Sequence, residues 1–424
     1  MQSVRGMRDV LPEEARRWRR VEDEMLAKLY GFAYEEIHIP LLESTDLFAR
    51  GVGEATDIVE REMYNLNDRD GESITLRPEG TAGCARVLSD AGLLYNQTQR
   101  VFYRGPMFRY ERPQRGRYRQ FYQIGAEAFG LPGPDIDAEL IQLGTVMWRS
   151  LGIDDAVTLE LNTLGSQAAR GAYREALVAH LTPQKDELDD DSQGRLSTNP
   201  MRILDSKSAA TQRLLNDAPL LIDYLDQASV EHYEGLKSLL EDLQIAYVEN
   251  PRLVRGLDYY TDTVFEWTTQ ALGAQGTICA GGRYDGLVEV IGGKPTPAAG
   301  FAIGVERVLL LHEELHQEVH GETLNAAVDV YCCVLEPRLH GWVLDFVQQL
   351  RQELPELRVR VHAGGGKLKN QLKRADQSGA DWALFFGEEE VQHNRVAVKH
   401  LREPGDQVAM ELEALVQHLT PKEN

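Results

Sequence analysis

The stretch VFYRGPMFRYERPQRGRYRQFYQIGAEAFG, residues 101–130, indicates the fold more clearly than any other part of the chain. Aromatic and β-branched residues dominate 101–111 and 118–130, and such runs are typical of β-strands. Between them lies RPQRGR, residues 112–117, a polar loop rich in arginine. The pattern predicts a long antiparallel hairpin whose loop carries several positive charges.

One face of this hairpin carries side chains suited to a ligand site. Because side chains alternate along a strand, one set of residues on the second strand shares a face: Arg119, Phe121, Gln123, Gly125 and Glu127. Arg109 and Glu111 are expected to share a face across the loop. Gly125 has no side chain, so we expect a gap there in which a ligand could lie against the backbone. The simpler alternative is an exposed sheet face that is merely polar.

A second hairpin is predicted upstream, where MYNLND and ESITLRP flank the turn at Asp70 and Gly71. It ends in LRPEGT, residues 76–81, at a strand-to-helix turn. Glu79 and Thr81 supply a carboxylate and a hydroxyl there, which suit the binding of an ammonium group. An ordinary N-cap role for Thr81 is the alternative.

Three further segments combine arginine with glycine. In LVRGLDYYTDTVFE, Arg255 precedes a glycine, and a guanidinium fixed in such a place can bind a phosphate or a carboxylate through two hydrogen bonds. AGGRYDG covers residues 280–286. In GFAIGVER, an apolar strand runs into a helix, Gly304 allows the close approach of a ligand, and Arg307 lies in the first helical turn.

The rest of the chain predicts two large domains. We expect the first domain to cover residues 1–320. Within it, we expect a helical insertion over 166–243, because this segment is acidic, rich in leucine and helical in period. HQEVHGETLNA, residues 316–326, is a polar linker. Strands and helices then alternate over 327–424, which predicts a separate α/β domain. Its helix KLKNQLKRAD follows three glycines and places Lys369 and Lys373 on one face.

Composition restricts the class of protein. The net charge of −22 argues against nonspecific coating of nucleic acid, so any such contact must be local. The sequence contains neither a long apolar run nor the apolar core of a signal peptide, which predicts a cytoplasmic protein. The four cysteines form no CxxC pair and no zinc-type cluster, so we expect buried, reduced thiols.

In this order the segments resemble the class II aminoacyl-tRNA synthetases, and specifically the histidyl-tRNA synthetases. RYERPQRGRYRQF is similar to motif 2, GFAIGVER to motif 3, and residues 32–52, with IHIPLLE, to the dimer-forming motif 1. LVRGLDYY and AGGRYDG resemble the pair peculiar to the histidine enzymes. The resemblance implies an α+β fold: a six-stranded antiparallel sheet flanked by helices, with a helical insertion and a C-terminal anticodon-binding domain.

The resemblance also implies an activity, the ATP-dependent ligation of L-histidine to its tRNA through histidyl-adenylate. It implies a homodimer, and Mg²⁺ that arrives with ATP and is not fixed by protein side chains. The implied histidine-binding residues are Glu79, Thr81, Arg109, Gln123, Glu127, Arg255, Tyr259, Tyr260 and Tyr284. The implied ATP-binding residues are Arg109, Glu111, Phe121 and Arg307, and the implied catalytic residues are Arg109, Arg255 and Arg307. The tRNA is expected to contact Gln114, Arg115, Lys369 and Lys373.

Two other classes of protein share parts of this pattern. One is a noncatalytic, synthetase-like regulatory subunit of histidine biosynthesis, but such subunits lack the anticodon-binding domain and depart at catalytic positions. This chain keeps Arg255, Arg307 and the C-terminal domain. The other is an ATP-dependent amino-acid ligase that acts on small molecules or proteins. It would need neither the arginine-rich hairpin loop nor the basic helix near Lys369.

Overall fold

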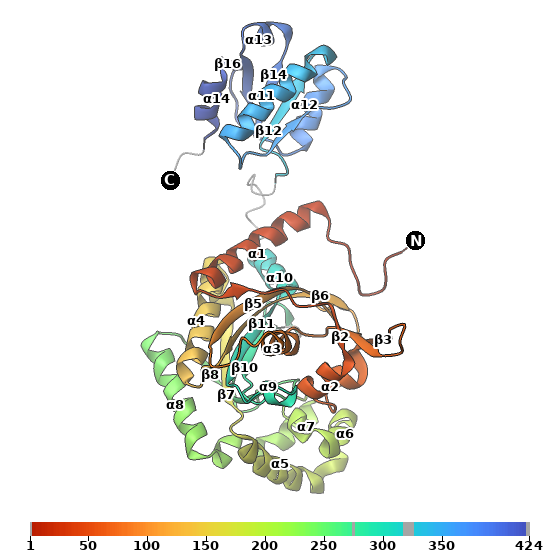
Figure 1. Cartoon of the computed structure of the whole chain (residues 1–424), viewed down its shortest axis with the longest axis vertical. Coiled ribbons are helices and arrows are strands. Elements are labelled where there is room, and N and C mark those ends of the chain that lie inside the picture. Colours follow the sequence, from red (N-terminus) through yellow and green to blue (C-terminus); the bar gives the residue numbers. More distant parts are fainter. Residues whose placement is uncertain (1, 274–275, 317–325, 421–424) are drawn as a thin grey trace. The chain divides into compact units, whose positions relative to one another are not determined.

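The computed structural model describes residues 2–273, 276–316 and 326–420, and Figure 1 traces the chain. It divides into two compact units, built mainly from Trp18–Gln317 and Glu318–Asn424. The predicted boundary at residue 320 and nearly all of the predicted linker lie outside the described residues. Within the described residues, no helix is long and apolar enough to cross a membrane. All four cysteines are buried and free, as predicted.

The larger unit is built on an eight-stranded sheet with the order β1-β5-β6-β11-β10-β9-β7-β8. The strands are β1 (Glu35–Glu36), β5 (Gln99–Phe108), β6 (Gln120–Phe129), β7 (Thr158–Thr163), β8 (Val248–Glu249), β9 (Thr261–Thr268), β10 (Thr277–Arg283) and β11 (Ala298–Gly304). The six inner strands, β5 to β7 in this order, pair with one another in antiparallel fashion, which confirms the predicted sheet. The short strands β1 and β8 extend it at both edges by parallel pairing.

The predicted hairpin of residues 101–130 forms β5 and β6, which pair from Gln99–Phe129 to Phe108–Gln120. The smaller predicted hairpin is also present, as β3 (Tyr64–Asn67) and β4 (Ser73–Leu76). With β2 (Leu42–Ser44), these strands form a separate three-stranded sheet. The turn of this hairpin contains Gly71 at φ +90°, a conformation that glycine adopts readily.

Helices cover both faces of the large sheet (Figure 1). On one face, a hydrophobic core joins the sheet to α1 (Pro12–Gly31), α4 (Pro134–Ser150), α8 (Gln227–Asp242) and α10 (Val305–Leu315). On the other face, a second core includes α3 (Thr81–Asp90), α9 (Leu287–Val290), α5 (Gln167–Leu181) and α6 (Asp190–Thr198). The helix α2 (Thr45–Val52) packs in a smaller cluster with Ile58 and Ala82. The ligand cavity described below opens on the α3 side.

The segment predicted as a helical insertion is helical. It contains α5 (Gln167–Leu181), α6 (Asp190–Thr198), α7 (Ala209–Leu214) and α8, with short 3₁₀ turns between them. Each helix follows a side chain that accepts a hydrogen bond from a backbone N–H of the first turn, and these caps are Ser166, Asp189, Ser208 and Asp226. In packing, however, the segment is divided: α8 lies against α4, and its Tyr233, Leu236 and Leu240 belong to the main core.

The smaller unit is a five-stranded sheet with the order β13-β12-β14-β15-β16. Its strands are β12 (Val330–Val334), β13 (Val359–Val361), β14 (Trp382–Phe386), β15 (Val396–His400) and β16 (Val408–Met410), and its helices are α11 (His340–Glu353), α12 (Leu368–Gln377), α13 (Glu388–Gln392) and α14 (Leu412–Leu419). The first three strands are parallel, and β15 and β16 are antiparallel. This agrees with the predicted α/β domain.

Candidate functional site

The larger unit contains a cavity of about 220 Å³ on the α3 side of its sheet. Five of the segments singled out in the sequence line it: the 76–81 turn, the β5–β6 hairpin, the 254–260 loop, the 280–286 segment through Ala280, and the junction of β11 with α10. Of the residues predicted to bind histidine or ATP, those in its lining are Glu79, Thr81, Arg109, Glu111, Phe121, Gln123, Arg255, Tyr259, Tyr260 and Arg307. Glu127 and Tyr284 lie behind this lining.

Glu127, on β6, forms the buried centre of one end of the cavity. Its Oε1 accepts hydrogen bonds from the Thr81 hydroxyl at 2.7 Å and the Tyr103 hydroxyl at 3.1 Å, and its Oε2 accepts one from Tyr284. The side chain is fully buried, and burial raises its pKa to about 8. Burial thus favours the protonated form of this carboxyl, whereas the three hydroxyl groups that it accepts from favour the ionised form.

Glu79 fixes the start of α3. Its carboxylate accepts the backbone N–H groups of Thr81 at 2.8 Å and Ala82 at 3.0 Å, which favours the ionised form, although burial raises its pKa above the usual value. Gly80 occupies the N-cap position. The alternative of an N-cap role for Thr81 is therefore wrong: Thr81 is the first helical residue, and its hydroxyl is directed to Glu127 instead.

Tyr103, on β5, was missed by the sequence analysis. It pairs directly with Gly125, and its ring occupies the space beside that glycine, so that a Cβ on Gly125 or Gly80 would overlap the ring. The predicted gap for a ligand at Gly125 is thus wrong, because the gap is filled from within the protein. The sequence does contain a clue, namely an aromatic residue that pairs with a glycine in the hairpin. That clue can be recognised only once the register of the two strands is known.

The loop between β8 and β9 contributes an aromatic wall and a cation. The Tyr259 ring lies 4.7 Å from that of Tyr260 and 5.4 Å from that of Tyr284, measured between centroids. The Arg255 guanidinium lies 5.5 Å from the Tyr260 ring centroid and forms an ion pair with Glu266 of β9. The Arg255 side chain is only 14% exposed, so this charge is held in place rather than freely hydrated.

The other end of the cavity is cationic. Arg109 lies 5.3 Å from the Phe121 ring centroid, and its Nε donates to the carbonyl of Pro78 at 2.8 Å. Arg307 donates to the carbonyls of Gly116 at 3.2 Å and Thr277 at 2.6 Å. Burial and the neighbouring guanidinium groups together lower the pKa of Arg307 to about 10, and burial lowers the pKa of Arg109. The crowded positive charge indicates an anionic ligand.

Sequence reasoning also missed three other residues that line the cavity: Arg117, Tyr118 and Glu306. Arg117 forms an ion pair with the predicted ligand residue Glu111. Glu306 accepts the backbone N–H of Tyr122 at 3.0 Å, and burial raises its pKa to about 7. Arg119 was expected on the ligand face, which is wrong: its guanidinium stacks on Tyr110, 3.7 Å from the ring centroid.

The residues predicted to contact tRNA are exposed. Gln114 and Arg115 lie in the tight turn of the β5–β6 hairpin, where Arg115 forms an exposed ion pair with Glu314 at 3.1 Å. In the smaller unit, Lys369 and Lys373 lie on the solvent side of α12, whose buried side carries Gln371 and Ala375. Exposed basic side chains are available to phosphates without desolvation of a buried charge.

Among the residues that the structure describes, no group of three or more His, Cys, Asp or Glu side chains is placed to hold a metal ion. At the cavity, Glu79 caps a helix, Glu111 faces Arg117, and Glu306 accepts a backbone N–H. These carboxylates are already engaged. A Mg²⁺ ion bound through the phosphate oxygens of ATP would need none of these carboxylates as a ligand.

Residues 6–308 match the family model described as histidyl-tRNA synthetase, and 329–421 match the model of the anticodon binding domain. The apo histidyl-tRNA synthetase of S. aureus shares 36% identity with this chain, with a TM-score of 0.80 over 99% of both chains. The histidyl-tRNA synthetase of Nostoc sp. PCC 7120 shares 19% identity, with a TM-score of 0.71 over 99% of this chain and 98% of that one. The second likeness concerns the fold alone. The chain belongs to the histidyl-tRNA synthetase family.

Proposed function

We propose that the cavity holds histidine at its carboxylate-containing end and ATP at its arginine-rich end, so that the two substrates meet near Arg255. A member of this family is a histidine–tRNA ligase: it activates histidine with ATP and charges tRNA with it through an adenylate. The observation that carries the assignment of the cavity is its charge distribution. Buried carboxyls gather around Thr81, whereas Arg109, Arg255 and Arg307 line the remainder.

For the histidine end, we assign the ammonium group to Glu79, Thr81 and Gln123. Glu79 supplies a carboxylate, and the Gln123 Oε1 is buried with no hydrogen-bond partner among the described residues, so it is able to accept an N–H. The imidazole would lie between Glu127 and Tyr260, with Tyr259 and Tyr284 around it. Imidazole has two polar edges, and an amino acid that leaves such buried groups unpaired is rejected by roughly a thousandfold or more.

Binding of imidazole to Glu127 requires a change in the hydrogen bonds that this side chain now makes. Its two oxygens already accept from three hydroxyl groups, so the imidazole must replace one of these partners or bind through one of them. A raised pKa gives this group a further capacity, since a protonated carboxyl is able to donate as well as accept. Either protonation state can therefore pair with one imidazole nitrogen.

For the ATP end, we assign the α-phosphate to Arg109, the γ-phosphate to Arg307 and adenine to a stack on Phe121, with Glu111 facing the adenine amino group. The histidine carboxylate would attack the α-phosphorus in line, and pyrophosphate would leave. Arg255 would bridge the attacking carboxylate and the α-phosphate. Fixed cations stabilise the charge that develops on the phosphate oxygens without reorganisation during the reaction. When it is bound with ATP, Mg²⁺ would neutralise further phosphate charge.

We further propose the domain organisation given by the sequence: a catalytic core over 1–320 with the helical segment 166–243 inside it, and an anticodon-binding domain over 327–424. The motif 2-like loop, with Gln114 and Arg115, would contact the acceptor end of tRNA(His), and α12, with Lys369 and Lys373, would contact the anticodon stem. We expect a cytoplasmic homodimer, because translation in the cytoplasm consumes the charged tRNA and residues 32–52 resemble the dimer-forming motif.

ATP–pyrophosphate exchange with each of the twenty amino acids, repeated as tRNA charging, tests the assignment. Exchange that depends on histidine alone, together with transfer of histidine to tRNA, supports it. Exchange with histidine but no charging of any tRNA would instead favour a ligase with another acceptor. A Lys369→Ala, Lys373→Ala double variant should keep exchange and lose charging, which separates the two halves of the proposal.

A further inference from the structure

The loop that carries Arg255, Tyr259 and Tyr260 is held from outside the catalytic sheet by the helical segment. We propose that Arg170 of α5 and Asn199, at the end of α6, are positioning residues for histidine binding. They fix the loop without contacting the substrate themselves. The inference rests on the proposed role of this loop in binding histidine, and it adds a function for the helical segment in amino-acid activation.

Arg170 makes the first contact. Its Nη1 donates to the backbone carbonyl of Tyr260 at 2.6 Å, from a helix that lies 90 positions earlier in the chain. Burial lowers the pKa of Arg170, but the guanidinium remains charged at any physiological pH. A charged donor at this distance makes a strong hydrogen bond, and its planar head restricts the direction of the carbonyl it binds. It therefore orients the peptide that follows the Tyr260 side chain.

Asn199 makes the second contact, through Asp258. Its Nδ2 donates to Asp258 Oδ1 at 3.0 Å, and the backbone N–H of Asp258 donates to the carbonyl of Val52 at 3.0 Å. Asp258 also lies against Gly53, where an added Cβ would come within 2.6 Å of Oδ2. Gly53 has φ +105°, so a larger residue is excluded there by both conformation and space. Asp258 is thus held from both sides.

Polar contacts matter here because the middle of the loop has no large side chain at Gly256, although the residues on both sides of it are packed in the core. Gly256 lines both the ligand cavity and a second cavity of about 290 Å³, so the chain at this point is a thin wall between two spaces. Asn199 and Arg202 line the second cavity, on the far side of that wall. The side chains of a binding site must be held to within roughly half an ångström of their working positions. A stretch of backbone that borders two cavities needs further contacts to be held so closely.

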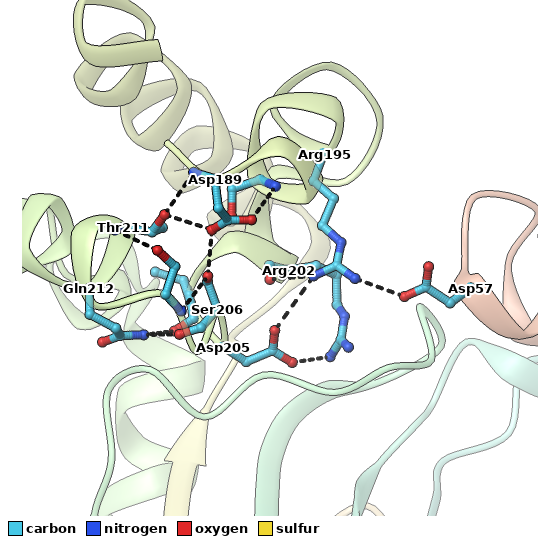
Figure 2. A network of polar contacts seen from close by, with 11 residues as sticks. Asp57, Asp189, Arg195, Arg202, Asp205, Ser206, Thr211 and Gln212 are labelled. Carbon is cyan, nitrogen blue, oxygen red and sulfur yellow. Dashed lines mark hydrogen bonds and ion pairs between the residues drawn. The ribbon is translucent and has the colours of Figure 1, made fainter. Parts of the chain in front are cut away.

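Asn199 directly follows α6, and a network of polar contacts holds that helix in place, as Figure 2 shows. Asp189, the cap of α6, accepts hydrogen bonds from the side chains of Ser192, Ser206 and Thr211, each at 2.7 Å. These bonds tie the start of α6 to the chain that follows it. At the other end of the network, Arg195 binds Asp57 of the catalytic core at 3.0 Å.

The same corner is anchored at the point where the loop enters β9. Asp262 has φ +41°, a conformation that residues other than glycine adopt at a cost. Its backbone N–H donates to Gly165 at 3.1 Å, its carbonyl accepts from Leu164 at 2.7 Å, and its side chain accepts from Ser229 at 2.8 Å. Gly165 lies next to Ser166, the cap of α5, so this anchor and Arg170 belong to the same short segment.

The test measures KM for histidine and for ATP, with kcat, in pyrophosphate exchange by the full-length chain. In Arg170→Ala we expect KM for histidine to rise about tenfold or more, from loss of a charged hydrogen bond. KM for ATP should change by clearly less, because Arg109, Phe121 and Arg307, which are assigned to ATP, lie outside this loop. Arg170→Lys should recover part of the loss, because an ammonium group can still donate to the carbonyl. Arg174→Ala is the matched control: it is exposed on the same helix and should behave as wild type.

Variants of Asn199 provide a second, independent test if Arg170→Ala does not fold. Asn199→Asp should raise KM for histidine more than Asn199→Ala, because it places a second carboxylate against Asp258. Unchanged KM for histidine in the foldable variants would overturn the proposal. So would an equal rise in both KM values with no rescue by lysine, which would indicate a general loss of structure. Arg255→Ala is measured alongside: if it stays active, the assignment of the loop fails, and not the role of Arg170.

Discussion

Replacing Arg255 with alanine should abolish adenylate formation, and the structure allows this loss to be separated from a loss of stability. Arg255 is the cation proposed to bridge the two reacting groups, and a fixed donor at developing phosphate charge is worth roughly a hundredfold to a thousandfold in rate. The same side chain neutralises Glu266 in a pair that is only 14% and 16% exposed. Removing one partner from such a pair costs about 3 kcal/mol of unfolding free energy.

A double variant distinguishes the two effects. In Arg255→Ala, Glu266→Gln, no carboxylate is left unpaired, and the glutamine can keep the hydrogen bond with the Thr277 hydroxyl, now 2.9 Å. We expect thermal unfolding to return most of the way to the wild-type midpoint while histidine-dependent pyrophosphate exchange stays at least about a hundredfold down. If the double variant regains exchange together with stability, Arg255 serves only to neutralise Glu266, and the proposed mechanism is wrong.

Three further outcomes are expected. Burial raises the pKa of Glu127 from 4.5 to about 8, so the folded protein binds more protons than the unfolded chain, and this group makes stability fall as pH rises between those values. Glu127→Gln should flatten that part of the curve of unfolding free energy against pH, as measured by denaturant titration. Sedimentation should show a dimer built on residues 32–52, and an active monomer at micromolar concentration would refute it. Deletion of 327–424 should leave histidine-dependent exchange largely intact and raise KM for tRNA, and undiminished charging by the truncated protein would contradict the assigned role of that domain.

Much of the fold could be predicted because its signals are local. The β5–β6 hairpin follows from two aromatic runs around a polar loop, and the four caps of the helical segment are residues that favour N-cap positions. How these helices pack is harder to predict from the sequence. The sequence of α8 resembles that of the helices before it, yet Leu236 and Leu240 are buried in the main core. Nothing in the helical period distinguishes which apolar face will meet the sheet.

The candidate site shows the same division. Arg109, Arg255 and Arg307 stand in segments with a clear pattern, and all three line one cavity. Tyr103 could not be found in this way, because its place depends on which residue lies opposite it in the paired strand. The ion pairs Arg117–Glu111 and Arg255–Glu266 were also missed, since each partner was considered only as a contact for a ligand. Charged groups in a buried site must first satisfy one another.

That requirement bears on how the site would change when substrates arrive. Glu111 is paired with Arg117, and Glu127 accepts from three hydroxyl groups, whereas Gln123 Oε1 and Arg255 Nε have no hydrogen-bond partner among the described residues. The proposed contacts of Glu111 and Glu127 with ATP and histidine therefore replace internal ones, whereas that of Gln123 adds a new one. Replacement of this kind favours ligands that restore every bond they break, and an amino acid without two ring nitrogens would leave a buried partner unpaired. Selectivity would then arise from the full set of internal contacts as much as from any single residue.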